Sequence, residues 1–262
     1  MNYRDVIFNE DCLVTMKRMK EEGVKVDLVL TSPPYNTSRK GSSLTDACQN
    51  IRYDEFDDCR TNEDYIDWTI NIFRSIEEVL SDNGCILYNL SYSSENTECM
   101  WRVVSDIISK TCFTVADCII WKKFSASPNS CSSNKLTRIC EFVFVICRKS
   151  EFHTFNCNKK VSSLRKTGQK SYENIFNFIE APNNDGSCDI HKATYSTVLV
   201  RKLLNIYAKK GILVYDPFMG TGTTAIGCIK EKCEYIGSEI SRRYVDIAEK
   251  RIKVETSQLT LF

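Results

Sequence analysis

A glycine-rich turn between an apolar strand and a helix places the strongest constraint on the fold of this 262-residue chain. The apolar run at residues 212–215 leads into DPFMGTGTT at 216–224, and a helical pattern follows to residue 228. Small residues at such a turn let backbone N–H groups approach a bound ligand. Glycine can also serve a tight turn for steric reasons alone. The segment predicts an α/β fold, with a cofactor loop as one of two interpretations.

The strand expected next along the chain favours a cofactor. It covers residues 235–238 and is followed directly by Glu239. A carboxylate at the tip of such a strand can accept hydrogen bonds from both hydroxyls of a ribose. The alternative is a glutamate that is simply solvated at a strand end. The turn and Glu239 therefore agree on a nucleotide-like ligand.

A second strand end carries the sequence TSPPY. The apolar run at residues 26–30 ends directly in this segment, 31–35. The Ser32 hydroxyl and the Pro33 carbonyl could each accept one hydrogen of a base amine, while the Tyr35 ring stacks on an extruded base. The alternative is a proline turn with a core tyrosine. Together with the glycine turn, the motif predicts methyl transfer to an exocyclic amine.

The remaining periodicity predicts strands and helices in alternation, within one domain. Further strands are expected at residues 6–8, 85–89, 116–122 and 141–147, and helices at 13–19, 63–80, 97–110, 195–209 and from 243 onward. Asn62 is a possible cap of the second helix.

Two segments lack this periodicity. Residues 36–62 are polar and turn-rich, which predicts a long mobile loop. Between Arg148 and Lys170 there are seven Lys or Arg residues and the single acid Glu151. This basic patch is hidden by the net charge of +1, a total that argues against non-specific coating of nucleic acid.

Composition limits the class of protein further. The 14 cysteines include no Cys-x-x-Cys pair, so we interpret them as buried thiols in a reducing compartment. Only His153 and His191 offer imidazole ligands, and we expect no metal. Residues 1–5 do not begin a signal peptide, and apolar runs such as 142–147 are too short to span a bilayer. We expect a soluble, cytoplasmic enzyme without membrane contact.

The two motifs resemble those of amino-directed DNA methyltransferases of restriction-modification type. In this chain LTSPPY at 30–35 precedes DPFMGTGTT at 216–224, an order similar to that of the beta class of this family. The resemblance covers nearly the whole chain. It implies a circularly permuted Rossmann-like fold that uses S-adenosylmethionine. The expected sheet is mostly parallel and seven-stranded, with an antiparallel hairpin and a small inserted target-recognition region.

The resemblance also implies a division of the chain. Residues 1–147 would form the first part of the catalytic domain, with the hairpin at 116–147. Residues 148–190 would form the target-recognition region, and residues 191–262 the cofactor-binding part. The implied catalytic residues are Ser32, Pro33, Pro34 and Tyr35. The implied cofactor-binding residues are Asp11, Cys12, Ser32, Tyr195, Asp216, Phe218, Gly220, Thr221, Gly222, Thr223, Thr224 and Glu239. Ser196 stands where the family often has proline, which weakens the assignments around residues 191–196.

Contacts with double-stranded DNA are expected from basic side chains on the loops and on the basic patch. They are Arg39, Lys40, Lys122, Arg138, Lys159, Lys160, Arg165, Lys166 and Lys170. Lys122 and Arg138 could equally be solvated charges.

The target base and the partners stay open at this stage. A serine in the position of Ser32 favours the 4-amino group of cytosine, and the 6-amino group of adenine is the alternative. Carbon-directed methylation fits poorly, because no proline precedes a cysteine. An RNA or protein-glutamine methyltransferase and a non-catalytic binding subunit are further alternatives. A cognate restriction endonuclease and a homodimer are possible partners.

Overall fold

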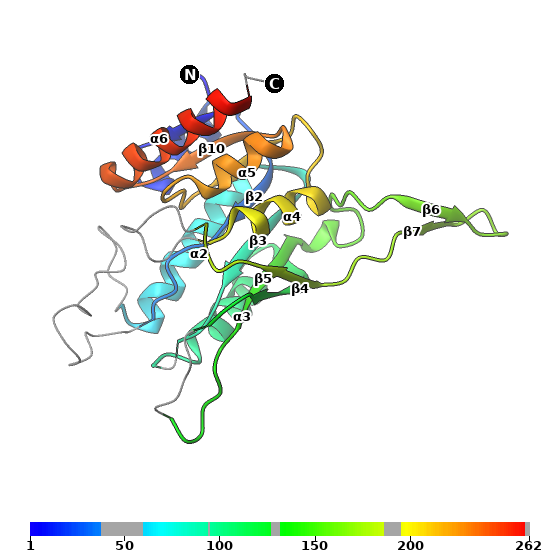
Figure 1. Cartoon of the computed structure of the whole chain (residues 1–262), viewed down its shortest axis with the longest axis horizontal. Helices are drawn as coiled ribbons and strands as arrows, with labels where there is room; N and C mark the ends of the chain where they lie inside the picture. Colours follow the sequence, from blue (N-terminus) through cyan, green and yellow to red (C-terminus); the bar gives the residue numbers. More distant parts are fainter. Residues whose placement is uncertain (38–59, 94, 127–131, 186–194, 260–262) are drawn as a thin grey trace.

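A computed structural model describes residues 1–37, 60–93, 95–126, 132–185 and 195–259. One sheet forms the centre of the molecule, and helices cover both of its faces (Figure 1). A core with Met16, Phe73 and Val103 lies under the helices of one face, and a core with Leu199, Val214 and Ala225 under those of the other. The α/β class predicted from the sequence is confirmed.

The main sheet has eight strands in the described part of the chain, in the order β1-β10-β9-β2-β3-β5-β4-β8. The first five of these are mutually parallel, β5 is antiparallel to both of its neighbours, and β8 is parallel to β4. The strands are β1 Val6–Phe8, β2 Val26–Thr31, β3 Leu80–Leu90, β4 Phe113–Lys123, β5 Cys140–Arg148, β8 Phe178–Ala181, β9 Leu213–Asp216 and β10 Glu234–Ser238.

Among the described residues, three helices cover each face of the sheet. One face carries α1 Cys12–Glu21, α2 Asn62–Val79 and α3 Cys99–Lys110, and the other carries α4 Thr197–Tyr207, α5 Thr223–Glu231 and α6 Arg242–Leu259. The N-cap of α2 is Thr61 rather than Asn62: its hydroxyl accepts a hydrogen bond from the backbone N–H of Asp64 at 3.1 Å. A threonine one residue earlier provides the same capping oxygen, which corrects the expected cap.

The expected count of seven strands is corrected to eight. The added strand, β8, comes from the segment assigned to target recognition and pairs with the outer edge of β4, from Ile120 opposite Phe178 to Lys123 opposite Ala181. Only Ile179 and Ala181 are buried in it, so its alternation covers four residues. Such a short pattern is too weak to predict a strand without the β4 edge beside it.

A second, two-stranded sheet projects from the body (Figure 1). Its strands are β6 Val161–Leu164 and β7 Lys170–Tyr172, which form an antiparallel hairpin. A short helix, η2 Lys149–Glu151, lies between β5 and this hairpin. Residues 159–170 are all exposed, so the hairpin contributes nothing to either core.

Candidate active site

The predicted motifs meet at one edge of the sheet. Because β1, β10, β9, β2 and β3 are parallel, their carboxyl ends lie side by side at what we call the carboxyl edge. Asp11 follows β1, Ser32 follows β2, and Glu239 follows β10, while Asp216 is the last residue of β9. Strands β9 and β2 are direct neighbours, with Val29 beside Tyr215. The TSPPY segment and the glycine turn therefore adjoin in space.

Asp216 ties these two segments together. Its side chain is fully buried, and its Oδ1 accepts hydrogen bonds from the Thr31 hydroxyl at 2.6 Å and from the Phe218 N–H at 2.9 Å. Its Oδ2 accepts from the hydroxyls of Thr224 and Tyr195. Burial raises the pKa of Asp216. Three expected cofactor residues, Asp216, Thr224 and Tyr195, thus use their polar atoms to hold the turn to its neighbours.

The glycine turn is closed by hydrogen bonds from both sides. The N–H of Gly222 donates to the Met219 carbonyl at 3.0 Å, and φ is 54° at Gly220 and 85° at Gly222. Arg251 on α6 donates to the Thr221 carbonyl at 2.7 Å and to the hydroxyls of Thr221 and Thr223. No sequence pattern pointed to Arg251, because it lies far along the chain on an amphipathic helix. The structure shows that it supports the turn.

Glu239 lies against the same turn. Its Oε2 accepts the Gly220 N–H at 2.8 Å, and its Oε1 accepts the Ser241 N–H at 2.9 Å. Burial raises its pKa to about 7. Each carboxylate oxygen has a second lone pair, so Glu239 keeps capacity to accept hydroxyl donors from a ligand.

The remaining expected cofactor residues also lie at the carboxyl edge. Asp11 caps α1 through its Oδ1, which accepts the Leu13 N–H at 2.8 Å, and Cys12 is buried beneath it. The Phe218 ring packs against Trp68 of α2, with the ring centroids 5.4 Å apart. Trp68 was not among the expected cofactor-binding residues. Its contact with Phe218 depends on how α2 packs over the sheet.

The TSPPY segment holds its two functional side chains at the surface of a rigid turn. Pro33 and Pro34 are buried, and the Tyr65 hydroxyl donates to the Pro34 carbonyl. Ser32 and Tyr35 are half-buried, with the Ser32 Oγ 2.9 Å from the Tyr35 hydroxyl. The Tyr35 hydroxyl also donates to Glu141 Oε2 at 3.0 Å.

Two side chains beside Ser32 and Tyr35 were not predicted. Asn89 of β3 donates from its Nδ2 to the Ser32 Oγ at 3.2 Å and to the Tyr35 hydroxyl at 2.5 Å. Lys123, the last residue of β4, forms an ion pair with Glu141. Asn89 has no local sequence signal, and both residues reach the motif only through strand pairing.

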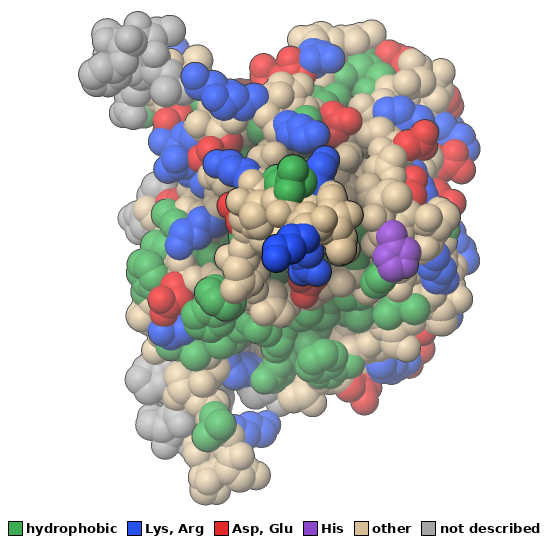
Figure 2. Space-filling view, turned by 90° about the vertical axis from the view of Figure 1, so that its right-hand side faces the viewer, with side chains coloured by type: hydrophobic (Ala, Val, Ile, Leu, Met, Phe, Trp, Pro, Cys, Tyr) green, Lys and Arg blue, Asp and Glu red, His purple; other side chains and the backbone are tan. Residues whose placement is uncertain are grey.

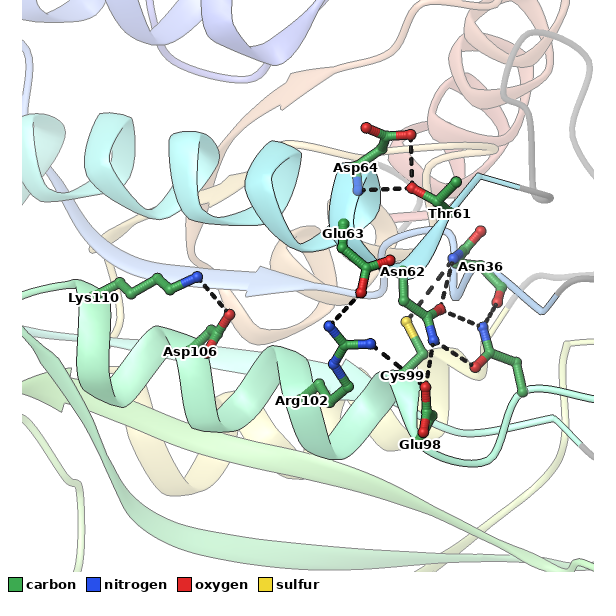
Figure 3. Close-up of polar contacts among 11 residues, drawn as sticks. Asn36, Thr61, Asn62, Glu63, Asp64, Glu98, Cys99, Arg102, Asp106 and Lys110 are labelled. Atoms are coloured by element: carbon green, nitrogen blue, oxygen red, sulfur yellow. Dashed lines mark hydrogen bonds and ion pairs between the residues drawn. The ribbon is translucent and has the colours of Figure 1, made fainter.

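An asparagine cluster fixes the chain directly after Tyr35 (Figure 3). Asn36 has a φ of 52°, and its Nδ2 donates to the Arg60 carbonyl at 3.1 Å. Asn96 donates to the Asn36 carbonyl at 2.9 Å and to the Asn62 Oδ1 at 2.8 Å. These contacts join the end of the TSPPY segment to the start of α2 and to the segment before α3. Residues 38–59, most of the expected mobile loop, lie outside the described residues.

The structure separates the expected DNA contacts into three groups. Arg39 and Lys40 lie outside the described residues. Lys122 forms an ion pair with Glu180 near the end of β4. Arg138 donates to the Tyr92 carbonyl at 2.6 Å and lies over the Tyr92 ring. Lys122 and Arg138 are thus at the carboxyl edge, already engaged in intramolecular contacts.

The third group lies on the β6–β7 hairpin: Lys159, Lys160, Arg165, Lys166 and Lys170. Strand β5 runs antiparallel to β3, so it leaves the carboxyl edge and ends at Arg148, which donates to the Leu80 carbonyl at the start of β3. Asn158 is bonded to the carboxyl end of α4, at the same amino edge. The structure therefore does not bring these five residues together with the TSPPY segment.

Basic side chains nevertheless gather on this arm. Figure 2 looks at the molecule from the side toward which the hairpin projects, and Lys and Arg side chains lie on the hairpin and around it. Exposed apolar side chains, Leu164, Tyr172 and Phe176 among them, accompany the charges. Strand β5 is nine residues long, so its end at Arg148 lies about 30 Å from the carboxyl edge, and the hairpin follows Arg148 in the chain.

Other kinds of site are absent from the described ranges. No group of three or more His, Cys, Asp or Glu residues among them could hold a metal ion. No helix in that part of the chain is long and apolar enough to cross a bilayer. Every cysteine in it is a free thiol.

The sheet order and the TSPPY segment beside the glycine turn are those expected of an α/β methyltransferase whose TSPPY segment precedes its glycine turn. The chain belongs to the DNA methylase family, whose model matches residues 26–250. It is therefore a DNA methyltransferase.

Relatives and solved structures agree with this family. The Type II methyltransferase M.Cfr9I of Citrobacter freundii is 25% identical and the alignment covers 97% of this chain and 89% of the relative. The DNA adenine methyltransferase YhdJ of Escherichia coli is 22% identical, and the alignment covers 97% of this chain and 84% of that protein. The PvuII DNA methyltransferase, described as cytosine-N4-specific, shares the fold with a TM-score of 0.67 at 15% identity, covering 96% and 91%. TTHA0409 of Thermus thermophilus, solved with S-adenosylmethionine, has a TM-score of 0.62 at 18% identity, covering 95% of each chain.

Proposed function

We propose that this enzyme transfers a methyl group from S-adenosylmethionine to the 4-amino group of a cytosine flipped out of duplex DNA. The observation that carries the proposal is the hydrogen bond of 2.6 Å between Thr31 and Asp216. It joins the strand that precedes Ser32 to the strand that precedes the glycine turn, through two residues 185 positions apart in the chain. An amine held at Ser32 would thus lie beside a cofactor held at the turn.

The residues at the turn fit this cofactor. Glu239 has free lone pairs for the two ribose hydroxyls, the half-buried Phe218 offers an aromatic face, and the half-buried Gly220 presents backbone without a side chain. Bound there, S-adenosylmethionine would supply an electrophilic methyl group on a sulfonium sulfur. Ser32 and the Pro33 carbonyl would accept the two amine hydrogens, and the Tyr35 ring would stack on the base.

Cytosine is favoured over adenine by Ser32 alone, because the family's adenine enzymes more often have Asp or Asn in that position. The names of similar proteins include both bases, since YhdJ is a DNA adenine methyltransferase and the PvuII enzyme is cytosine-N4-specific. Methylation of the adenine 6-amino group by the same residues is therefore the second candidate.

Nucleoside mass spectrometry of methylated duplex DNA tests the proposal. We expect N4-methylcytosine after incubation with the enzyme and S-adenosylmethionine. N6-methyladenine would establish the second candidate. Labelled cofactor offered with DNA, RNA and protein in parallel tests the substrate class, and label in RNA alone would contradict a DNA substrate.

The contacts with DNA are part of the same proposal. Contacts with DNA near the target base are assigned to Lys122 and Arg138 at the carboxyl edge, together with Arg39 and Lys40 outside the described residues. The five basic residues of the hairpin would bind phosphates of DNA outside the target site, since the chain leaves the carboxyl edge along β5 before it reaches the hairpin. A cognate restriction endonuclease, in line with the Type II name of M.Cfr9I, and a homodimer complete the proposed partners.

A further inference from the structure

Five polar side chains from four separate segments meet around the TSPPY turn. Ser32 and Tyr35 follow β2, Asn89 lies on β3, Glu141 on β5 and Lys123 at the end of β4. Strand β5 stands between β3 and β4 in the sheet, so it carries Glu141 to both Asn89 and Lys123.

The hydrogen bonds among these groups run in one direction. Tyr35 donates its only proton to Glu141 Oε2 at 3.0 Å. The contact of 2.9 Å between the two hydroxyls is then donated by Ser32, with the Tyr35 oxygen as acceptor. The two hydrogens of Asn89 Nδ2 serve three nearby acceptors, the Ser32 oxygen at 3.2 Å, the Tyr35 oxygen at 2.5 Å and Glu141 Oε2 at 3.0 Å. The path therefore begins at Ser32 and ends at a carboxylate.

Such a path matches what the proposed reaction must remove. When the amine nitrogen forms its bond to the methyl carbon, the sulfur keeps the electron pair of the bond that breaks. The nitrogen then has four bonds and a positive charge, and it must lose one proton. Ser32, which contacts this amine in the proposed function, is too weak a base to keep that proton alone.

We propose that Glu141 is the final acceptor of the amine proton, reached through Ser32 and Tyr35. The amine gives its proton to the Ser32 oxygen as Ser32 passes its own to the Tyr35 oxygen. Tyr35 in turn passes its proton to Glu141 Oε2. Each hydroxyl gains one proton and loses one, the nitrogen becomes neutral, and Glu141 becomes a carboxylic acid.

Lys123 and Asn89 prepare Glu141 for this step. The Glu141 side chain is only 12% exposed, and Lys123 pairs with its Oε1, so the charge is compensated and Oε2 is left for Tyr35. Lys123 also lies 5.0 Å from the centre of the Trp121 ring, which limits its positions. Asn89 contacts both Ser32 and Glu141 and holds the two side chains in place relative to each other. Both act through other groups and are positioning residues.

Substitutions at Glu141 separate proton acceptance from simple positioning. Glu141→Gln keeps a hydrogen-bond acceptor of the same size for Tyr35 but cannot take the proton. Glu141→Asp keeps a carboxylate on a shorter side chain. In single turnover with saturating cofactor and DNA, we expect Gln to lower the rate at least about 100-fold and Asp less than about 10-fold. Dissociation constants for S-adenosylmethionine and for DNA should stay within about threefold of wild type.

A matched control and a second variant complete the test. Glu151→Gln breaks another part-buried ion pair, that with Arg148 at the far end of β5, and should leave the rate unchanged. Tyr35→Phe keeps the ring and the Lys123 pair but interrupts the path, so it should be about as slow as Glu141→Gln, and it decides the matter if the Gln variant does not fold. The proposed path would be overturned if Glu141→Gln reacted at the wild-type rate, or if Glu141→Asp reacted more slowly than Glu141→Gln. The inference rests on the proposed function, whose own failure would appear as wild-type enzyme that methylates no DNA.

Discussion

Glu239 at the carboxyl edge has a role in the fold and a proposed role in binding the cofactor. Its two oxygens accept backbone N–H groups of Gly220 and Ser241, and burial still raises its pKa to about 7. The loss of water around the carboxylate thus outweighs two hydrogen bonds. A site that titrates near neutral pH follows from this balance.

The ionisation of Glu239 should therefore control cofactor affinity. We expect binding of S-adenosylmethionine to strengthen from pH 6 to 8, because the ionised carboxylate accepts ribose hydroxyls better than the acid. Glu239→Gln should bind more weakly and lose this pH dependence, as calorimetry can measure. Without cofactor, the stability of the protein depends on pH in the opposite direction. The pKa is raised on folding, so this residue's contribution to the free energy of unfolding is full below about pH 4.5 and falls as pH rises through about 7. Equal pH dependence in both proteins would contradict the assignment.

At the element scale, glycines in and after the glycine turn allow neighbouring helices to pack closely. Gly222 precedes α5, and a Cβ added to it would lie 2.9 Å from the Ala248 Cβ of α6. At Gly227, inside α5, an added Cβ would overlap the Val200 side chain of α4. Gly222, which was expected to admit a cofactor, thus lets α6 approach the turn, and Gly227 lets α4 pack closely against α5.

Gly222→Ala should destabilise the protein by about 2–5 kcal/mol, the sum of a strained positive φ and an overpacked contact. Gly23→Ala provides the matched control. Its φ is 69°, yet nothing lies within 4 Å of the added Cβ. We expect it to lose only about 1–2 kcal/mol. Denaturant unfolding measures both values, and equal losses would mean that the Ala248 contact is relaxed at no cost.

The β6–β7 hairpin is the element whose place decides how DNA can be bound. Replacing Lys159, Lys160, Arg165, Lys166 and Lys170 by Gln should leave binding to a duplex of about 12 base pairs unchanged, because it cannot extend from the target site to the hairpin. On a duplex of about 40 base pairs, the affinity should fall and its salt dependence should weaken. Fluorescence anisotropy at several salt concentrations measures both. An equal loss on the short duplex would place the hairpin at the target base, and no loss on either would exclude phosphate contacts.

Considered as a whole, the molecule is a sheet between two helical layers, with an exposed arm outside the two cores. Residues 159–170 are exposed throughout, and the Glu173 N–H bonded to the Lys160 carbonyl at 2.9 Å closes the base of the arm. A two-stranded hairpin alone is only marginally stable in water. Cooperative unfolding should therefore not depend on it.

Replacing residues 161–172 by a short Gly-Ser turn should change the melting temperature by less than about 3 °C, since no core residue is removed. Methylation of a short duplex should be retained. Calorimetry and nucleoside mass spectrometry provide the two readouts. A large fall in melting temperature would show that the arm is part of the cooperative unit.

Short stretches of sequence were enough to predict the α/β class, the two strand-end motifs and their order. Each motif consists of an apolar run followed by a turn, and such a pattern can be recognised from neighbouring residues alone. The gathering of Asn89, Glu141 and Lys123 around Ser32 and Tyr35 exists only in the folded chain, as does the extension of the sheet by β8. The position of the basic hairpin at the amino edge also depends on the complete sheet. The reason is the reversal of direction at β5, which carries the chain away from the carboxyl edge after Glu141. Local periodicity identifies a strand but carries no information on its direction in the sheet or on the partner beside it.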